Sequence, residues 1–526
     1  MEFITWYAIA AGSMIVFLIL MRVASSVKPL AETVSRAISK HLLYPHLLGR
    51  HRLLGPWTRV VLLLYLVYGA INVFFLTFRT SSNSERGRRA GSLALINMGF
   101  LFLTMQLSLL ANLLGISFHA CRRIHGATAW MMTLLLAFHI IVATMVDQKD
   151  FRLKEEGNLF AVVGAASVAA LVLFSFTIFR RLAFEVFIRT HQCLAAVCMY
   201  ATWWHLSSKP RALQLCLYIP LAILLLTTLS HLSIFLYQNG ILPARSYPYA
   251  SVMCGKSSKP GANQNEGTPL KLRVALPRPL HVKAGQYVNL WMPTVSLSSW
   301  FQTHPFMVTS WSPGKQDVLE LFVQTRRGLT ETLRARAALD GTASFTAFVS
   351  GPYGISKPVD EYETVLAVAS GFGIAGVIPY LKQLLYGYNT SSVRVRRLHL
   401  VWQVPTLDIA AAAQPLLNSL LADDVLDDGY IIEMSFYVES KIPVESGTPF
   451  GEHQRAVIYN DMPEYDVLVS TEASGDYIPR VSNTQEERGK LLVLVSASDK
   501  VRDDLRKIVC KYLDRRVRLH EVEFQP

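Results

Sequence analysis

The sequence predicts a multi-pass α-helical membrane domain of about seven helices, followed by an antiparallel β-barrel and an α/β domain. Three observations carry this prediction. Apolar runs of about 20 residues, enough to cross a bilayer, recur until roughly residue 240 and then stop. Short strand-like segments with turn residues between them begin near residue 268. Beyond residue 358, strands alternate with helices, which is typical of a parallel sheet.

Composition and charge indicate a membrane partner. The 526 residues are 51% hydrophobic and only 17% charged, which is apolar for a wholly soluble chain. Many of the basic residues behind the net charge of +13 flank apolar runs, where such residues anchor helix ends and meet anionic lipid. We therefore expect membrane lipid and no nucleic acid as a partner. The 6 cysteines show neither CxxC spacing nor a disulfide framework.

Hydropathy predicts seven spans. They cover residues 4–23, 55–78, 91–115, 125–146, 158–179, 185–206 and 212–237. The first run lacks a basic segment before it and is followed by Arg22 and Lys28, so we expect a retained anchor with its N-terminus outside. An odd number of spans then puts the soluble part in the cytosol. Loops on both sides are basic, so this orientation rests mainly on the soluble domains after the last span.

Two histidine pairs lie inside these runs. His125 and His139, like His191 and His205, are separated by 14 residues (139 − 125 and 205 − 191). On an α-helix this step leaves a rotation of about 40° and a rise of roughly 21 Å, so both histidines of a pair share one face. Two such helices side by side would offer one imidazole pair near each side of the bilayer. Imidazole is a common axial ligand of haem iron, which predicts two stacked bis-histidine haems.

The alternative is a purely structural set of histidines that satisfy local hydrogen bonds. Four histidines with matched spacing argue against it, because ionisable groups in membrane helices are functional by default. In the expected topology His125 and His191 form the inner pair, and His139 and His205 the outer pair.

The soluble half begins with a stretch rich in Gly, Ser and Pro at residues 245–267, which is typical of a mobile linker. The segments LKLRVALP, QYVNLWMP, FMVTSW and VLELFVQTR then predict the small antiparallel barrel. Further on, GFGIAG lies between the strand ETVLAVAS and the helix VIPYLKQLLYG. Glycines in such a turn let the backbone approach a pyrophosphate at the helix N-terminus, although GxGxxG alone is weak evidence.

Together these motifs resemble the fungal ferric reductases, within the larger family that includes the NADPH oxidases and has a ferredoxin-reductase-like dehydrogenase. The motifs are the two histidine pairs, HPFMVTSW, RRGLT, GPYG, GFGIAGVIPY, LVWQ and the terminal EVEFQP, and they span about residues 90–526. The resemblance implies N-terminal helices with a cytosolic loop over 1–90, a di-haem transmembrane domain over 91–240 and a linker over 241–267. It implies an FAD-binding barrel over 268–358 and an NAD(P)-binding α/β domain over 359–526.

The resemblance also implies roles for individual residues. The flavin would be lined by one strand and its continuation, namely His304, Pro305, Phe306, Met307, Val308, Thr309 and Ser310. The FAD pyrophosphate would meet the turn and helix start of Arg327, Gly328, Leu329 and Thr330. The dinucleotide would meet Gly351, Pro352 and Tyr353, then the glycine turn of Gly371, Gly373 and Gly376. Ser496 would approach the nicotinamide, and Phe524 would cover the flavin.

Three departures from the family pattern stand out. Met307 replaces a Thr or Ser whose hydroxyl can bond the flavin, and Ser496 stands where a Cys-Gly-Pro segment is common. The strand that meets the adenosine end finishes in VWQVP without the arginine that often follows in NADPH-specific relatives; Arg394, Arg396 and Arg397 precede it instead. The choice between NADPH and NADH therefore stays open, with NADPH as the donor that the resemblance implies.

The expected activity is transmembrane metal reduction. Electrons from cytosolic NADPH would pass through FAD and two b-type haems to extracellular ferric or cupric complexes, in support of iron uptake, with FAD converting a two-electron donor to one-electron acceptors. Two alternatives remain: an NADPH oxidase that makes superoxide, and a non-catalytic haem membrane protein. The family implies the plasma membrane, and it leaves an iron-uptake permease or oxidase open as a partner.

Overall fold

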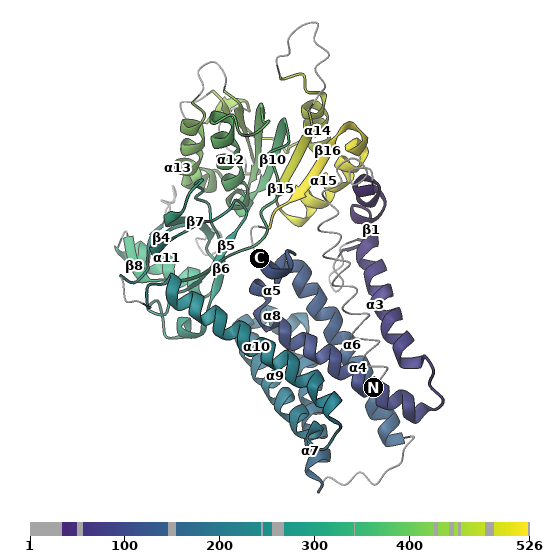
Figure 1. Ribbon diagram of the computed structural model, residues 1–526. Coiled ribbons are helices and arrows are strands. Elements are labelled where there is room, and N and C mark those ends of the chain that lie inside the picture. The colour runs from purple at the N-terminus through teal and green to yellow at the C-terminus, as the bar shows by residue number, and fades with distance from the viewer. Residues whose placement is uncertain are drawn as a thin grey trace. The chain divides into compact units, whose positions relative to one another are not determined.

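The computed structural model describes residues 34–49, 56–145, 154–242, 246–254, 268–340, 342–425, 430–440, 446–450, 454–478 and 489–523 (Figure 1). The chain divides into two compact units, Met1–His231 and Leu232–Pro526. The first is helical. The second contains the strands of a barrel and of an α/β domain, so the helical and dehydrogenase-like parts of the prediction fall into separate units.

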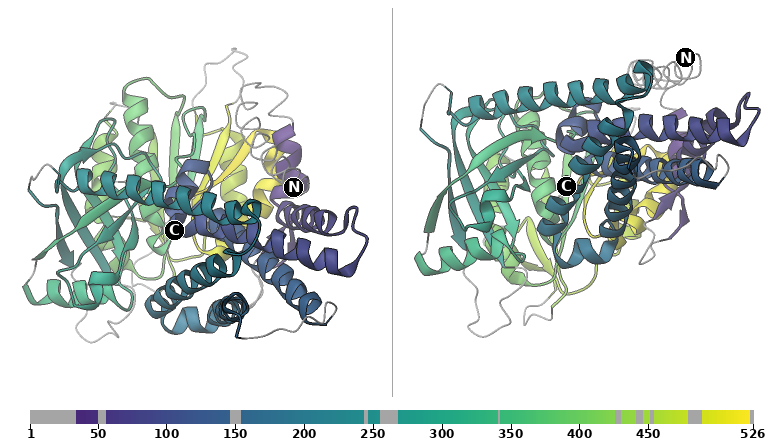
Figure 2. Two further views of the ribbon diagram at one scale, coloured as in Figure 1. Left: turned by 60° about the horizontal axis from the view of Figure 1, so that its bottom comes forward. Right: turned by 90° about the horizontal axis from the view of Figure 1, so that it is seen from below.

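The first unit begins with a short π-helical turn, η1 (Ser39–Leu43), and a two-stranded ribbon of β1 (His46–Leu48) and β2 (Trp57–Thr58). Its helices follow in the order α3 (Arg59–Thr77), α4 (Asn83–Leu103), η2 (Thr104–Gln106), α5 (Leu107–Leu114), α6 (Phe118–Met145), α7 (Glu156–Phe174), α8 (Thr177–Leu182), α9 (Phe184–Leu206) and α10 (Arg211–Gln238). Helix α10 is one long helix despite Pro220 in its interior (Figure 2).

Four described helices are long and apolar enough to cross a membrane: α3, α6, α7 and α10. A fifth is added if α4 and α5, which are bent at η2, form one broken span. The multi-pass prediction is confirmed at this level, whereas the number seven is not. Helix α9 coincides with the expected span 185–206 but is not among the candidates, because polar residues such as His191, Gln192 and His205 lower its mean hydropathy. The expected span 4–23 lies outside the described residues.

Helix α4 begins eight residues before the expected span 91–115. The reason is an N-terminal cap: the Ser82 hydroxyl accepts a hydrogen bond from the backbone N–H of Glu85 at 3.2 Å, and a Glu85 carboxylate oxygen accepts one from Ser81 N–H at 3.0 Å. The arrangement differs from a standard capping box only in that Glu85 bonds the residue before the N-cap, and it satisfies two backbone donors at the helix start. The helix therefore includes Arg86, Arg88 and Arg89. Hydropathy alone leaves these charged residues outside the predicted span.

Helix α4 packs against α6, and α7 packs against α9. Small residues permit close approaches within the unit, as is usual between membrane helices. A side chain at Gly87 of α4 would overlap Val142 of α6. At Gly99 of α4 it would come within 3.0 Å of the Cys216 carbonyl oxygen, which Pro220 leaves without its helical partner. Many large apolar side chains on these helices stay exposed, which suits a lipid solvent.

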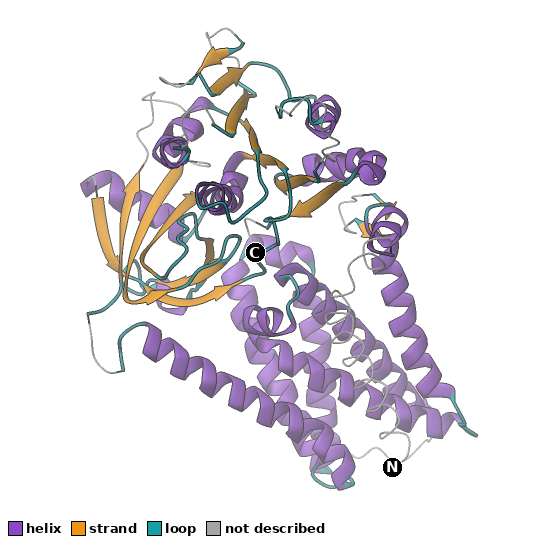
Figure 3. Cartoon of the chain, turned by 45° about the horizontal axis from the view of Figure 1, so that its top comes forward, coloured by secondary structure: helices purple, strands orange, loops and turns teal. Residues whose placement is uncertain are grey.

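The barrel consists of two antiparallel sheets (Figure 3). One has the order β7-β4-β3-β8 and the other the order β6-β5-β9. The strands are β3 (Tyr249–Cys254), β4 (Pro269–Leu280), β5 (Tyr287–Trp291), β6 (His304–Met307), β7 (Gln316–Gln324), β8 (Thr342–Thr346) and β9 (Phe348–Tyr353), with η3 (Ser298–Phe301) and helix α11 (Leu329–Asp340). Strand β3 differs from the expected linker over 241–267, because it pairs with both β4 and β8 inside the sheet. Residues 255–267 lie outside the described chain.

The α/β domain has a seven-stranded sheet in the order β13-β14-β12-β11-β10-β15-β16, parallel except for β13. Its strands are β10 (Thr364–Ser370), β11 (Arg397–Val404), β12 (Ile432–Val438), β13 (Thr448–Pro449), β14 (Ala456–Tyr459), β15 (Leu491–Ser496) and β16 (Val517–Glu521). Its helices are η4 (Gly371–Gly373), α12 (Ile374–Asn389), α13 (Leu407–Asp423), α14 (Tyr465–Ser474), α15 (Asp499–Tyr512) and η5 (Leu513–Arg515).

The order of these strands places a topological switch point between β10 and β15. The chain runs outward from β10 to β11 and β12, then returns to β15 on the other side of β10. Because parallel crossovers are right-handed, α12 and α13 cover one face of the sheet and α14 and α15 the other. Ligands of such sheets bind outside the carboxyl ends of the strands at the switch point. The predicted parallel sheet is confirmed. Its switch point predicts a ligand site at the carboxyl ends of β10 and β15.

Candidate functional site

The glycine turn after β10 packs directly on the end of β15. A side chain at Gly373 would overlap the carbonyl oxygen of Ser496, and one at Gly376 would lie 2.7 Å from the Ser496 hydroxyl. Gly371 has φ of +50°, a conformation that favours glycine, and its carbonyl accepts a hydrogen bond from the Trp402 indole at 2.8 Å. Steric contact with β15 thus explains two of the three glycines, and backbone conformation explains the third.

Ser496 is the last residue of β15 and is 0% exposed. Its hydroxyl has no hydrogen-bond partner among the described residues. A buried polar group without a partner is costly, and in a native structure it often marks the place of an unseen ligand or water. The hydroxyl lies beside the glycine turn, where the switch point predicts the dinucleotide. These residues therefore fit a nicotinamide dinucleotide.

The residues predicted to line the flavin divide into two groups. His304 is half-buried and Pro305 exposed, whereas Phe306 and Val308 pack in the core of the barrel and Met307 is buried. Two hydroxyls hold the barrel together instead of facing outward: Thr309 donates to the Glu320 carbonyl at 2.8 Å, and Ser310 accepts from the Glu320 N–H at 3.1 Å. Of this set, His304 and Pro305 have the access that contact with a ligand needs.

The segment before α11 forms a turn suited to an anion. Gly328 has φ of +95° with open space around it, and Arg327 is exposed. The Thr330 hydroxyl accepts from Arg326 N–H and donates to the Arg326 carbonyl, both at 2.7 Å, so it stabilises the turn itself. The first N–H groups of α11 together with a guanidinium can bind a phosphate. The turn therefore fits the pyrophosphate of FAD.

The GPYG segment ends β9 and joins the barrel to the α/β domain. Gly351 and Gly354 have φ of +129° and +99°. The Tyr353 hydroxyl lies 2.7 Å from the Ser350 hydroxyl, and burial raises the pKa of Tyr353. Pro352, between them, is half-buried.

Contacts that sequence analysis missed fix the barrel against the glycine turn. Phe322 of β7 stacks on Phe372 within the turn, with ring centres 5.3 Å apart. The Tyr380 hydroxyl of α12 accepts a hydrogen bond from Lys357 N–H at 2.9 Å. It occupies the space in which a side chain at Gly285 would lie. Burial raises the pKa of Tyr380. The only hint in the sequence was an aromatic residue inside a glycine motif.

The inner histidines face each other. The rings of His125 and His191 have centres 6.2 Å apart, although they lie on different helices. Two metal–nitrogen bonds of about 2 Å each, with the half-widths of two rings, give roughly 6 Å between ring centres. His125 Nδ1 lies 2.6 Å from the Thr104 hydroxyl, and the buried His191 Nδ1 has no partner within the part of the chain described. This spacing fits one metal ion between the rings.

The outer histidines are oriented by backbone carbonyls. His139 Nδ1 donates to the Gly87 carbonyl at 2.8 Å, and His205 Nδ1 donates to the Gly157 carbonyl at 2.9 Å. A proton on Nδ1 leaves Nε2 as a neutral acceptor, which is how histidines that bind metals are usually held. The ring of His139 also fills the space beside Gly91, where a side chain would lie 2.9 Å from Nδ1.

No group of three or more His, Cys, Asp or Glu side chains that could hold a metal ion occurs among the described residues. An ion between two histidines would therefore need its remaining ligands from a bound group. A porphyrin supplies four nitrogens in one plane and leaves two axial positions for imidazoles. The inner pair fits haem for this reason, and the outer histidines present the same neutral nitrogen donors. Phe524, predicted to cover the flavin, lies outside the described residues.

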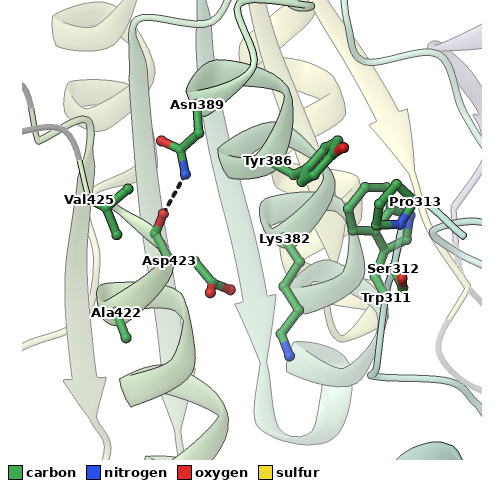
Figure 4. Close-up of a pocket in the computed structure, with 9 residues that line it drawn as sticks. All are labelled: Trp311, Ser312, Pro313, Lys382, Tyr386, Asn389, Ala422, Asp423 and Val425. Atoms are coloured by element: carbon green, nitrogen blue, oxygen red, sulfur yellow. Dashed lines mark hydrogen bonds between the residues drawn. The ribbon is translucent and has the colours of Figure 1, made fainter.

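A separate cavity of about 320 Å³ lies between the barrel and helices α12 and α13 (Figure 4). It is lined by Trp311, Ser312, Pro313, Lys382, Tyr386, Asn389, Ala422, Asp423 and Val425. The rings of Trp311 and Tyr386 are 5.6 Å apart, and the Asn389 side chain donates to the Asp423 carbonyl at 2.7 Å. The cavity contains none of the predicted site residues, so it is distinct from the switch point.

Three family models match the chain one after another. Residues 90–202 match the ferric reductase like transmembrane component, residues 261–357 the FAD-binding domain, and residues 362–511 the ferric reductase NAD binding domain. Together they span more than half of the chain, in the order of the helices, the barrel and the α/β domain. The chain belongs to the ferric reductase family. The predicted resemblance and the multi-pass membrane, FAD-binding and NAD(P)-binding parts are thereby confirmed.

Relatives in yeast support this family. The chain is 28% identical over 264 residues to ferric/cupric reductase transmembrane component 2 of Saccharomyces cerevisiae, covering 50% of this chain and 34% of that protein. It is 26% identical over 314 residues to ferric reductase transmembrane component 3 of the same yeast, covering 58% and 40%. These matches span well under half of the relatives' length, so the activity and substrates of the whole proteins do not transfer directly.

One solved structure aligns with much of this ferric reductase family member. It is a flavohemoglobin from Malassezia yamatoensis with bound FAD and haem, 11% identical, with 84% of this chain and 99% of that chain covered. The TM-score is 0.36, which is too low to support any argument about fold or function.

Proposed function

We propose that this protein is a transmembrane metalloreductase, which passes electrons from a cytosolic nicotinamide dinucleotide through FAD and two b-type haems to extracellular ferric or cupric complexes. The observation that carries the proposal is the pairing of His125 with His191 at 6.2 Å between ring centres, in a chain with FAD-binding and NAD-binding domains. The chemistry that bound FAD and haem would supply is the conversion of a two-electron donor into single-electron transfers. The plasma membrane and a role in iron uptake are part of the proposal.

The α/β domain would hold the dinucleotide at the switch point. The turn of Gly371, Gly373 and Gly376 would bind its pyrophosphate through backbone N–H groups at the start of α12. The unpartnered hydroxyl of Ser496 would hydrogen-bond the nicotinamide carboxamide, which supports the role implied by the family resemblance. Gly351, Pro352 and Tyr353 would border the same site from the barrel. A hydroxyl in place of a thiol keeps a hydrogen bond but provides no thiolate.

The barrel would hold FAD with fewer residues than the motif suggests. Arg327, Gly328 and the first turn of α11 would bind the pyrophosphate, with Thr330 holding the turn. His304 and Pro305 would contact the flavin, while Phe306, Val308, Thr309 and Ser310 would shape the strand behind it. Met307 offers no hydroxyl, so flavin hydrogen bonds would come from the backbone of this strand. Phe524 remains a proposed cover for the ring.

The helical unit would hold the two haems. His125 and His191 would hold the inner haem, and His139 and His205 would hold the outer haem. The carbonyls of Gly87 and Gly157 support this by fixing the tautomer of the outer pair. The family resemblance implies NADPH as the donor. NADPH and NADH differ in one phosphate, and the residues at the ends of β11 and β12 bear on the choice between them.

One assay tests the proposal against superoxide production and against a non-catalytic haem protein. The purified full chain, with FAD and haem bound, is reconstituted into liposomes with the nucleotide on the flavin side and a ferric chelate on the other. We expect ferrous chelate to form at a rate that superoxide dismutase does not change. Loss of the signal with dismutase would indicate an oxidase. No reduced iron and no superoxide, despite bound cofactors, would refute catalysis.

A further inference from the structure

The carboxyl ends of β11 and β12 lie next to the glycine turn. Gln403, near the end of β11, is the register partner of Ser370, the residue directly before Gly371. On the other side Gln403 pairs with Tyr437 of β12, and Glu439 N–H donates to the Val404 carbonyl at 2.9 Å. In doubly wound dinucleotide-binding domains, this region beside the phosphate-binding strand receives the adenosine ribose. An acidic residue there bonds the ribose 2′-hydroxyl, whereas an arginine accommodates a 2′-phosphate.

A chain of hydrogen bonds fixes the chemistry of this edge. The Tyr465 hydroxyl of α14 donates to the Gln403 carbonyl oxygen at 2.9 Å, and the Gln403 amide donates to a Glu439 carboxylate oxygen at 2.9 Å. Both strong side-chain donors are therefore directed at acceptors inside the protein. Glu439 is the last residue of this hydrogen-bonded series. It is exposed, and the group that it presents is a carboxylate. A carboxylate accepts a hydrogen bond from a hydroxyl, but it repels a phosphate.

Several carboxylates act on the tyrosines of this edge. Burial, followed by Tyr459 and the carboxylates Asp461, Glu433 and Glu464, raises the pKa of Tyr437. Burial, followed by Tyr437, Asp504 and Glu439, raises the pKa of Tyr465. Glu433 lies at the other end of β12, in an ion pair with Arg397. The other carboxylates add to the repulsion of a dianionic group at this edge.

The nearest arginine on β11 is at the wrong end of the strand. Arg397 is six residues before Gln403, which corresponds to about 20 Å along a strand. Its guanidinium is held by Glu472 at 2.7 Å and Glu433 at 2.8 Å, and it lies over the Tyr477 ring at 4.1 Å. Breaking this network to reach a ligand would leave the buried Glu472 carboxylate with His399 as its remaining side-chain partner. Lys441 lies outside the described residues, and a variant of it serves as a control.

We infer that the dinucleotide site selects NADH over NADPH, with Glu439 accepting a hydrogen bond from the ribose 2′-hydroxyl and excluding the 2′-phosphate. This inference rests on the proposed function only in assigning the site to a reduced nicotinamide donor. It departs from NADPH, the donor that the family resemblance implies.

The test measures both use and binding of the two nucleotides with the purified full chain. Reduction of ferricyanide gives kcat/KM for NADH and NADPH, and titration with NAD⁺ and NADP⁺ gives two dissociation constants without any turnover. We expect wild type to favour NADH and NAD⁺ by at least about tenfold in both measurements. Glu439→Gln should reduce the preference for NADH over NADPH by roughly tenfold, because it removes one negative charge near the 2′-position.

Two variants serve as controls. Glu433→Gln removes one negative charge from the same strand at its other end, and it should leave the NADH to NADPH ratio unchanged. Lys441→Ala should also leave it unchanged. The inference is overturned if wild type binds NADP⁺ as tightly as NAD⁺, if Glu439→Gln leaves the ratio unchanged, or if Lys441→Ala selectively weakens NADP⁺. If neither nucleotide reduces ferricyanide while FAD is bound, the proposed function fails, and the two dissociation constants still decide the preference.

Discussion

Ser496 and Gly373 approach so closely that a single methyl group on Gly373 would overlap the Ser496 carbonyl oxygen. The contact joins the end of β15 to the turn after β10, and it leaves the Ser496 hydroxyl buried beside that turn. Since the obstacle is backbone and not the tip of a flexible side chain, the turn and the strand end must move apart to accept any larger residue. The dinucleotide site is thus defined by two backbone segments in contact.

Gly373→Ala should therefore impair dinucleotide use while FAD stays bound. Overpacking of this kind costs about 1–3 kcal/mol, so we expect kcat/KM for nicotinamide-driven ferricyanide reduction to fall by about tenfold or more. Gly314→Ala is a matched control, because a side chain at Gly314 meets nothing within 4 Å. Equal activity of the two variants would show that the contact does not shape the site.

Gly91→Ala should disturb the outer haem. A methyl group there would lie 2.9 Å from His139 Nδ1 and displace the ring from its hydrogen bond to Gly87. We expect a shifted or diminished haem absorbance and slower iron reduction, with the flavin reactions unchanged. Gly69→Ala on α3, where a side chain meets nothing within 4 Å, is the control. An unaltered spectrum in Gly91→Ala would argue against His139 as a ligand.

Asn239, directly after α10, should be important for the stability of the barrel. It is 1% exposed, and its side chain both accepts from Val349 N–H at 2.7 Å and donates to the Val349 carbonyl at 2.8 Å. Asn239→Ala leaves two buried backbone groups without partners, at a cost of about 1–3 kcal/mol. We expect a lower melting temperature and weaker FAD retention. Gln238→Ala removes one bond, to the Gly351 carbonyl at 2.8 Å, and should have the smaller effect; the reverse order would contradict this account.

His520 should make the α/β domain sensitive to mild acid. Burial, with smaller effects of Lys357 and Arg518, lowers the pKa of His520 to about 4 from its ordinary 6.5. The unfolded chain therefore takes up this proton at higher pH than the folded chain, so the stabilisation is complete above pH 6.5 and is lost as pH falls toward 4. His520→Phe can keep the edge-on contact with Tyr362, whose ring centre is 5.9 Å away. The fall in melting temperature between neutral and mildly acidic pH should be smaller in this variant; an equal fall would exclude His520 as its source.

Much of the fold could be predicted from the sequence because its patterns are local. Hydropathy located α3, α6, α7 and α10, and the alternation of strand and helix located β10, α12 and β11. Strand β3 was missed because the Gly- and Ser-rich stretch after it suggested a linker, while its pairing partners β4 and β8 are distant in sequence. The early start of α4 was missed because its capping residues Ser82 and Glu85 precede a run of arginines.

The candidate site was predictable to a smaller extent. The spacing of the histidines predicted that they would pair, and His125 and His191 do so. The motif around His304 could not reveal that Thr309 and Ser310 direct their hydroxyls at Glu320, since that partner comes from another strand. Likewise, the contact of Phe322 with Phe372 depends on how the barrel meets the α/β domain. Tertiary partners of this kind leave no periodic signal in the sequence.

The central claim is that two histidine pairs hold two haems in series, and the most direct test is the reduced-minus-oxidised haem spectrum produced by the nicotinamide donor under anaerobic conditions. We predict that wild type reduces two haems per chain and that His139→Ala retains only the inner one, still reducible. His125→Ala should lose the inner haem and leave the remaining one unreduced, while His231→Ala on α10, outside both pairs, should match wild type. Full haem content and full reduction in His125→Ala and His139→Ala would contradict the claim.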